Sequence, residues 1–133
     1  MKYPDVFEVY TKDGLQNDPS MGYYFKVPGL LAFGFPVWKR TRSLFGPSWS
    51  SSPNYLFRVK TPRTSTHHAR DRWTIFDDYT NETHYKASAE PPANSHLPPA
   101  TGWDHASIRG SETTKSDIFV EKSYLGKDDM GKL

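Results

Sequence analysis

The sequence predicts an all-β fold: one small antiparallel sheet, folded as a sandwich or a partly open barrel of about six or seven strands, with an extended C-terminal arm. Short runs of aromatic and β-branched residues alternate with clusters of Gly, Pro, Asn and Ser, which is typical of strands and turns. No stretch shows apolar residues at the helical period of roughly 3.6 residues. Aromatic residues make up 15% of the 133 residues, so a few large rings can supply most of a small core.

The first half of the chain is expected to form three strands. Residues 6–10 alternate apolar and polar side chains, and a turn follows them. Residues 21–27 form the second strand, which the Pro-Gly pair at 28–29 should end. Residues 30–35 are apolar but interrupted by glycine, and we interpret them as a buried loop or a bulged strand. The third strand, residues 35–40, contains a proline that suits a sheet edge or the start of a strand.

The second half continues the same pattern with longer connections. Residues 55–59 alternate well enough for a strand, whereas residues 60–71 show no apolar periodicity and predict a long exposed loop. Residues 72–76 form the clearest strand, because aromatic and β-branched side chains fill it, and residues 85–89 are its expected partner. Residues 90–101 hold four prolines, which exclude a helix and favour extended backbone.

The tryptophans are interpreted as core residues. We expect Trp103 to fold back over the sheet, because the stiff Pro98-Pro99 segment directs it there. A buried ring at this position would contribute strongly to stability.

Two parts are expected along the chain. Residues 1–103 read as one β-rich module, since the chain is too short for two ordinary domains. Residues 104–133 are polar and nearly balanced in charge, and their apolar side chains gather at Ile118-Phe119-Val120 and Tyr124-Leu125. Such a segment buries too little apolar surface to fold alone, so we expect an extended or disordered C-terminal arm, without which the module still folds.

The charge is distributed unevenly although the formal net charge is only +2. Residues 77–104 hold five acids and a single base, Lys86, whereas Asp71 is the single acid between residues 39 and 72. One edge of the domain is therefore expected to be basic and another acidic. The eight basic residues of the first stretch are Lys39, Arg40, Arg42, Arg58, Lys60, Arg63, Arg70 and Arg72.

The absence of cysteine and of long apolar runs bears on the cellular compartment that we expect for this protein. The sequence has no cysteine, which excludes disulfides, thiolate metal sites and cysteine nucleophiles, and mildly favours a reducing compartment. It contains neither an apolar run of about 20 residues nor an apolar signal region near its start. We expect no transmembrane segment and an intracellular protein, in the cytoplasm or inside an organelle after removal of a targeting peptide.

The order of the aromatic segments resembles that of a small β-module that recurs in protist and marine-invertebrate proteins. The resemblance covers residues 6–103, and its most specific part is Pro98-Pro99-Ala100-Thr101-Gly102-Trp103 placed downstream of Arg72-Trp73-Thr74-Ile75. It implies a β-rich interaction module without assigned catalysis. It implies no functional residues.

Candidate chemical sites are few. His67-His68 together with His84 and Asp77-Asp78 have the side chains of a zinc site, but adjacent residues of an extended backbone point to opposite sides. We therefore expect exposed loop histidines and no metal or cofactor. No Gly-x-Ser-x-Gly motif is present, and the paired acids are typical of turns, so no catalytic residue is assigned.

The predicted function is that of a non-catalytic accessory or scaffold subunit, which docks onto a larger protein assembly through its polar loops and C-terminal arm. By analogy, an organellar photosynthetic or respiratory complex is one candidate host. The basic loop could instead meet lipid headgroups at a membrane surface. The expected partner-binding residues are Arg58, Lys60, Arg63, Arg70, Ile118, Phe119, Tyr124 and Leu125.

The alternative is a freestanding module that binds a glycan or single-stranded nucleic acid. Rings flanked by cations form stacking platforms for bases, and this hypothesis requires an exposed aromatic row. The candidate rings are Trp49, Tyr55, Phe57 and Trp73.

Overall fold

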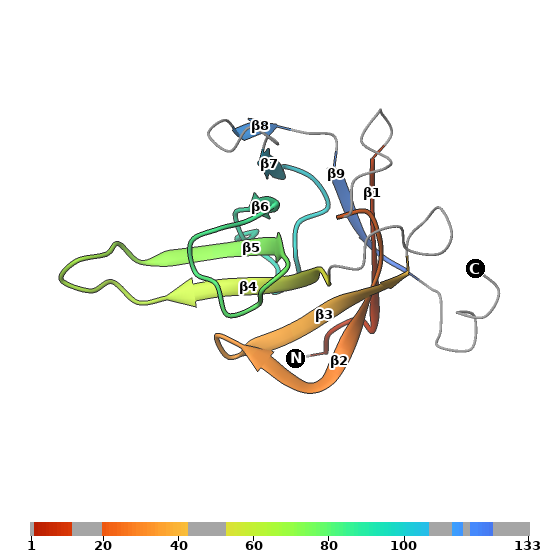
Figure 1. The fold of residues 1–133 in the computed structure, drawn as a ribbon, viewed down its shortest axis with the longest axis horizontal. Coiled ribbons are helices and arrows are strands. Elements are labelled where there is room, and N and C mark those ends of the chain that lie inside the picture. Colours follow the sequence, from red (N-terminus) through yellow and green to blue (C-terminus); the bar gives the residue numbers. More distant parts are fainter. Residues whose placement is uncertain (1, 12–19, 43–52, 107–112, 116–117, 124–133) are drawn as a thin grey trace.

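The computed structural model describes residues 2–11, 20–42, 53–106, 113–115 and 118–123. In these ranges the chain forms one sheet of nine strands and no helix (Figure 1). A search of the described residues finds no helix long and apolar enough to cross a membrane. The strands are β1 (Val6–Thr11), β2 (Gly22–Ala32), β3 (Phe35–Arg42), β4 (Tyr55–Thr61), β5 (Arg70–Phe76), β6 (Ala87–Ala89), β7 (Asp104–Ala106), β8 (Thr113–Lys115) and β9 (Ile118–Lys122).

The sheet curls into a nearly closed barrel. Its order is β8-β7-β6-β5-β4-β3-β2-β1-β9, and each neighbouring pair is antiparallel. The outermost strands, β8 and β9, are separated by only two residues in the chain, so the chain itself crosses the gap between the two edges. The Val120 amide donates to the Ala100 carbonyl at 3.0 Å and joins β9 to the segment before β7. The all-β antiparallel class is confirmed, with nine strands in place of six or seven.

Strand β2 continues past the Pro-Gly pair at residues 28–29, which was expected to end it. The register of β2 and β3 shifts between Lys26 and Leu31, so the pair at 28–29 lies in an irregular stretch rather than at a strand end. The strand then pairs to Ala32↔Phe35, which leaves Phe33 and Gly34 as a two-residue turn. Both have positive φ, 52° and 85°, as this tight hairpin turn requires. Residues 30–35, interpreted from the sequence as a buried loop or a bulged strand, therefore form the end of β2, this turn and the start of β3, and the register shift precedes Leu31.

The barrel interior is filled by the indole rings of Trp38, Trp73 and Trp103, each fully buried. The ring of Trp38 lies 6.0 Å from that of Trp73 and 5.1 Å from that of Phe7. The ring N–H of Trp38 donates to the Pro4 carbonyl at 2.9 Å, so the segment before β1 is held against the core. Trp73 Nε1 finds no acceptor in the described part of the chain, which marks it as a polar atom inside an otherwise apolar core.

A second apolar cluster lies on the other face of β3 and β4. Val37, Phe57 and Val59 are buried there, although their strands already contribute residues to the interior. They are covered by side chains from the β2–β3 turn and from the loop after β5, which include Phe33 and Tyr79. This double burial explains the continuous apolar run Tyr55-Leu56-Phe57, because both faces of β4 are covered over this stretch.

The C-terminal segment belongs to the sheet wherever the structure describes it. β9 pairs with β1 from Phe7↔Lys122 to Thr11↔Ile118, and Ile118 and Val120 lie in the interior with 1% and 2% exposure. The predicted boundary after residue 103 is therefore corrected, since β7, β8 and β9 complete the barrel. The physical reason is that two apolar side chains at alternate positions suffice when a neighbouring strand offers its backbone hydrogen bonds. Residues 124–133 lie outside the described residues.

Trp103→Ala should lower the free energy of unfolding by about 3–5 kcal/mol, because it leaves a large cavity in the interior. It also removes the ring N–H that donates to the Pro99 carbonyl at 2.8 Å. Urea denaturation followed by circular dichroism measures this loss. Leu31→Ala is the control, since Leu31 is 61% exposed, and it should change stability by less than about 0.5 kcal/mol. Equal stability of the Trp103 variant and the parent would place the ring outside the core.

A chain ended at residue 103 should fail to fold, because it lacks β7, β8 and β9 and exposes the edge of β1 that β9 covers. Thermal melting and the dispersion of amide signals in proton NMR report this directly. A cooperative melt of the shortened chain would instead support the prediction that residues 1–103 fold without the C-terminal segment.

Candidate functional site

The β4–β5 hairpin extends away from the barrel and carries four of the predicted partner-binding residues (Figure 1). The strands pair as far as Thr61↔Arg70, so the predicted loop 60–71 is shortened to residues 62–69. All eight of these residues are exposed. Their sequence has no apolar periodicity, and so it predicts no strand or helix there.

Local hydrogen bonds order the hairpin end without regular structure. Thr64 Oγ1 accepts the amides of Thr66 and His67 at 3.3 and 3.0 Å, and the Thr64 amide donates to the His67 carbonyl at 2.9 Å. Side-chain oxygens that bind nearby amides stabilise turns in this way. The loop therefore has a defined shape although all of its residues face solvent.

The loop between β5 and β6 faces this hairpin end and is ordered by the same device. Asn81 Oδ1 accepts the amides of Thr83 and His84, both at 2.8 Å. Asp78 Oδ1 accepts the Thr80 hydroxyl at 2.6 Å and the Thr80 amide at 2.9 Å, and these two hydrogen bonds hold the pKa of Asp78 below its ordinary value. Residues 81–83 match the glycan-acceptor pattern, and here the asparagine oxygen is engaged in a turn.

A cavity of about 660 Å³ lies between the two loops. Two further cavities, of about 500 and 200 Å³, lie along the hairpin, and Arg70 lines all three. The largest is lined by hydroxyls, imidazoles and charged groups, among them Thr64, His67, His68, Arg70, Asp78 and Asn81. The site is therefore polar, and Arg70 is its common member.

Arg70 keeps most of its donors for a ligand. Its Nη1 donates to the Glu82 carbonyl at 2.6 Å, and this is its one hydrogen bond within the described residues. A guanidinium has five N–H donors, so four remain. Lys60 and Arg63 are exposed and form no ion pair with the described part of the chain. Lys60 Nζ does lie 5.9 Å from the centre of the Phe35 ring and directly opposite Asp71 in the register. The outer part of the hairpin therefore carries three cations that form no ion pair within the described chain.

Arg58 is engaged inside the protein instead. Its Nε and Nη2 donate to the two carboxylate oxygens of Asp71 at 2.7 and 2.9 Å, and its guanidinium carbon lies 4.8 Å from the centre of the Phe35 ring. Its side chain is only 13% exposed. The hydrogen bond from Arg58, opposed by partial burial, lowers the pKa of the Asp71 carboxyl. Arg58 therefore braces the hairpin, and its expected role in partner binding is corrected.

The remaining predicted anchors lie far from the hairpin end. Ile118 is buried in the interior and cannot reach a partner. Phe119 is half-buried on the outer face of β9 and stacks on Tyr10 at 5.3 Å. Tyr124 and Leu125 lie outside the described residues. Lys60, Arg63 and Arg70 all lie on the outer part of the hairpin, and the register Lys60↔Asp71 and Thr61↔Arg70 directs Lys60 and Arg70 to opposite faces of it. β9 lies on the opposite side of the barrel (Figure 1).

The histidine cluster weighed from the sequence does not form a metal site within the described chain. No group of three or more His, Asp or Glu side chains there is arranged to hold an ion. His84 stacks on Phe76 at 6.2 Å, whereas His67 and His68 line the large cavity. His67 Nδ1 lies 2.8 Å from Thr66 Oγ1, so one ring nitrogen is already engaged.

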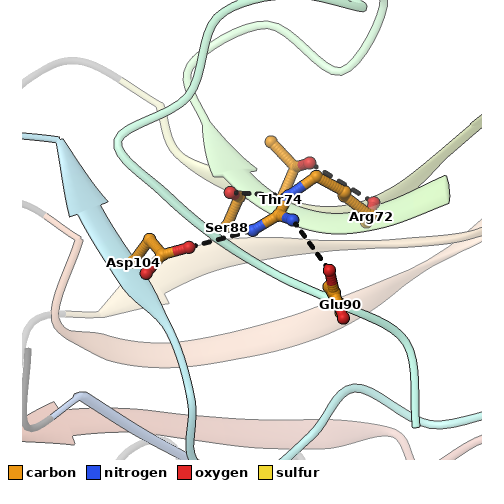
Figure 2. A network of polar contacts seen from close by, with 5 residues as sticks. All are labelled: Arg72, Thr74, Ser88, Glu90 and Asp104. Carbon is orange, nitrogen blue, oxygen red and sulfur yellow. Dashed lines mark hydrogen bonds and ion pairs between the residues drawn. The ribbon is translucent and has the colours of Figure 1, made fainter. Parts of the chain in front are cut away.

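A polar network that sequence reasoning missed supports the base of the hairpin (Figure 2). Arg72 on β5 donates to Ser88 Oγ on β6 and to Asp104 Oδ2 on β7, both at 3.1 Å, and Glu90 lies 3.9 Å away. Because β6 has only three residues, this side chain ties β5 to β7 across it. No sequence signal links residues 72 and 104, since tertiary folding alone brings them together.

The exposed aromatic row required by the alternative function is not found at the hairpin. Phe57 and Trp73 are fully buried, and Tyr55 is half-buried against Tyr79 at 5.0 Å. Trp49 lies outside the described residues. Within the described residues, the one large hydrophobic side chain that is well exposed is that of Leu31, which is not aromatic.

The site can bind anions. Guanidinium and ammonium groups beside hydroxyls recognise carboxylates or phosphates. No family model, curated protein or solved structure matches this chain. The function is therefore argued from the geometry alone.

Asp71→Asn should remove a pH-dependent part of stability. In the parent, the pKa of Asp71 is lower in the folded state than its unfolded-state value of about 3.9, so the ionised carboxylate stabilises the fold at pH values above that value. This contribution disappears as the pH falls through the lower pKa of the folded state. We expect the variant to be about 1 kcal/mol less stable at pH 7, a small figure because the carboxylate is 38% exposed. The difference from the parent should vanish near pH 2.

Urea denaturation at several pH values measures this difference. Asp77→Asn is the matched control, because Asp77 is exposed and forms no ion pair within the described chain. A constant difference between parent and Asp71 variant at all pH values would contradict the role of the ion pair.

Proposed function

We propose that this protein is a non-catalytic accessory or scaffold subunit that docks onto an acidic surface of a larger protein assembly through the end of its β4–β5 hairpin. One observation supports the proposal: Lys60, Arg63 and Arg70 all lie on the outer part of a hairpin that projects from the barrel, and none of them forms an ion pair within the described chain. Internal stability does not require these charges at this position, since the ion pair that braces the hairpin uses Arg58.

The ordered loops favour docking. Binding costs free energy when loops and side chains must be immobilised, and a segment already held by its own hydrogen bonds pays less of that cost. Both loops around the large cavity have such bonds, from Thr64 on one side and Asn81 on the other. The hairpin can therefore present its cations in one geometry.

The chemistry of Arg70 favours carboxylates. A guanidinium binds a carboxylate with two parallel hydrogen bonds, and a lysine ammonium nearby adds attraction at longer range. Clustered charges also speed the encounter with an oppositely charged surface, in a manner that salt weakens. An acidic protein surface fits these features better than a stack of bases, because the rings near the hairpin are buried or half-buried.

A small-molecule ligand is the second candidate, and the cavity of about 660 Å³ between the loops favours it. Volumes of this size accommodate small ligands, and the hydroxyl and amide lining suits a glycan. A glycan would bind in the cavity whatever the salt concentration, whereas docking to an acidic protein should weaken as salt rises.

The double variant Lys60→Glu/Arg63→Glu should lose association with its native assembly. We expect at least a tenfold reduction in the protein that co-purifies with that assembly, because two repulsive charges replace two attractive ones. Co-purification of tagged parent and variant from the native cells, at low and at moderate salt, measures the effect. Lys60→Glu places a carboxylate directly opposite Asp71 and should lower the melting temperature. Arg63→Glu alone should leave it near that of the parent, since Arg63 lies in the exposed loop, and should still weaken association.

The matched control is Lys2→Glu/Lys39→Glu, which makes the same charge change at exposed positions outside the hairpin. It should associate like the parent. Equal losses in both double variants would show a general charge effect, and no loss in either would contradict docking through the hairpin.

A further inference from the structure

A second surface lies on the opposite side of the barrel, on the outer face of β9, β1 and β2. Its members are Glu8, Tyr10, Tyr23, Phe119 and Glu121, which we term the acidic aromatic face. The strand register places Glu8 directly opposite both Tyr23 and Glu121, and Tyr10 opposite Phe119. The five side chains therefore form two neighbouring rows about 7 Å apart along the strands.

The rings form one half of this surface. The planes of Tyr10 and Phe119 are inclined by only 17°, with centres 5.3 Å apart. All three aromatic side chains are partly exposed. Stacked and partly exposed rings offer a negative π surface to which cations, guanidinium above all, are attracted.

The two carboxylates form the other half. Glu8 and Glu121 lie directly opposite each other on neighbouring strands, where like charges destabilise a sheet, and each accepts a hydrogen bond from a tyrosine, Tyr23 and Tyr10 respectively. Neither forms an ion pair with a cation of the described chain. The register pairs two basic residues with this face: Arg42 with Tyr23, in the row of Glu8, and Lys39 with Phe25, in the next row.

The pKa shifts of these groups reflect burial, the charges of the two carboxylates and their hydrogen bonds to the tyrosines. Burial raises the pKa of Glu8, with the charge of Glu121 acting in the same direction and a hydrogen bond from Tyr23 opposing. A hydrogen bond to Glu121 raises the pKa of Tyr10, and burial followed by the charge of Glu8 raises that of Tyr23. A bound cation would offset the repulsion between the two carboxylates.

We propose that the acidic aromatic face binds arginine side chains of a cationic segment of a partner protein. Carboxylates accept the guanidinium hydrogen bonds while a ring covers its flat face, a combination that an arginine satisfies and a compact, strongly hydrated lysine ammonium satisfies less well. Charge complementarity thus selects the occupant. This surface is independent of the hairpin, which carries the opposite charge at the other side of the molecule.

The test uses the full chain and three fluorescein-labelled octapeptides, in which glycine alternates with arginine, lysine or glutamate. Fluorescence anisotropy at low salt should show binding of the arginine peptide, weaker binding of the lysine peptide and none of the glutamate peptide. Glu8→Gln/Glu121→Gln should lower the affinity for the arginine peptide at least tenfold. Tyr10→Leu/Phe119→Leu should lower the affinity for the arginine peptide more than that for the lysine peptide.

The matched control is Asp77→Asn/Glu82→Gln, which removes two exposed acids from the hairpin side and should bind the arginine peptide within about twofold of the parent. The Glu8/Glu121 variant should melt at or above the parent temperature, because it relieves a like-charge pair. If it fails to fold, Glu121→Gln alone provides the test, since Glu121 is exposed.

Three results would overturn the proposal: parental affinity in the folded glutamine variant, an equal loss in the control, or binding of the glutamate peptide as tight as that of the arginine peptide. The Lys60→Glu/Arg63→Glu variant should bind the arginine peptide at least as well as the parent. Failure of hairpin docking and failure of this site are therefore distinguishable.

Discussion

Three buried indole rings dictate the dimensions of this protein. A short curled sheet encloses little volume, and the side chains of Trp38, Trp73 and Trp103 fill it with few aliphatic residues. Buried indoles also demand acceptors, and irregular segments supply two of them: the Pro4 and Pro99 carbonyls bind the ring N–H groups of Trp38 and Trp103. The same rings that fill the barrel therefore attach its N-terminal segment and its proline-rich connection, which explains how a chain with 35% hydrophobic residues builds a single core.

Closure of the barrel depends on the chain rather than on a continuous ladder of hydrogen bonds. The outer edges of the sheet are β8 and β9, which follow each other in sequence and pair with β7 and β1. Where the strands are only three residues long, side chains replace the missing ladder: Arg72 spans from β5 over β6 to Asp104 on β7. Short strands, a bridging arginine and one backbone bond at the seam together protect edges that could otherwise pair with other chains.

The division of the charged residues follows from this architecture. Cations needed for folding are paired, as in Arg58 with Asp71 and Arg72 with Asp104, and lie near the barrel. Lys60 and Arg63, near the hairpin end, form no ion pair within the described chain, and neither do Glu8 and Glu121 on the opposite side. Two surfaces of opposite charge on one small rigid body suit a protein that joins others, and this is the physical basis of both proposals.

The sequence by itself determined the all-β class, most strand positions, the burial of the three tryptophans and the local turns, because these follow from alternation, aromatic content and residues with fixed backbone preferences. It also located the cations that meet at the hairpin. Only the tertiary structure decided that Arg58 is braced internally, that Ile118 closes the barrel and that Glu8 meets Glu121. Strands of three residues and pairs far apart along the chain have no periodic signature, since their hydrogen bonds and charges acquire partners only when the sheet curls and distant segments become neighbours.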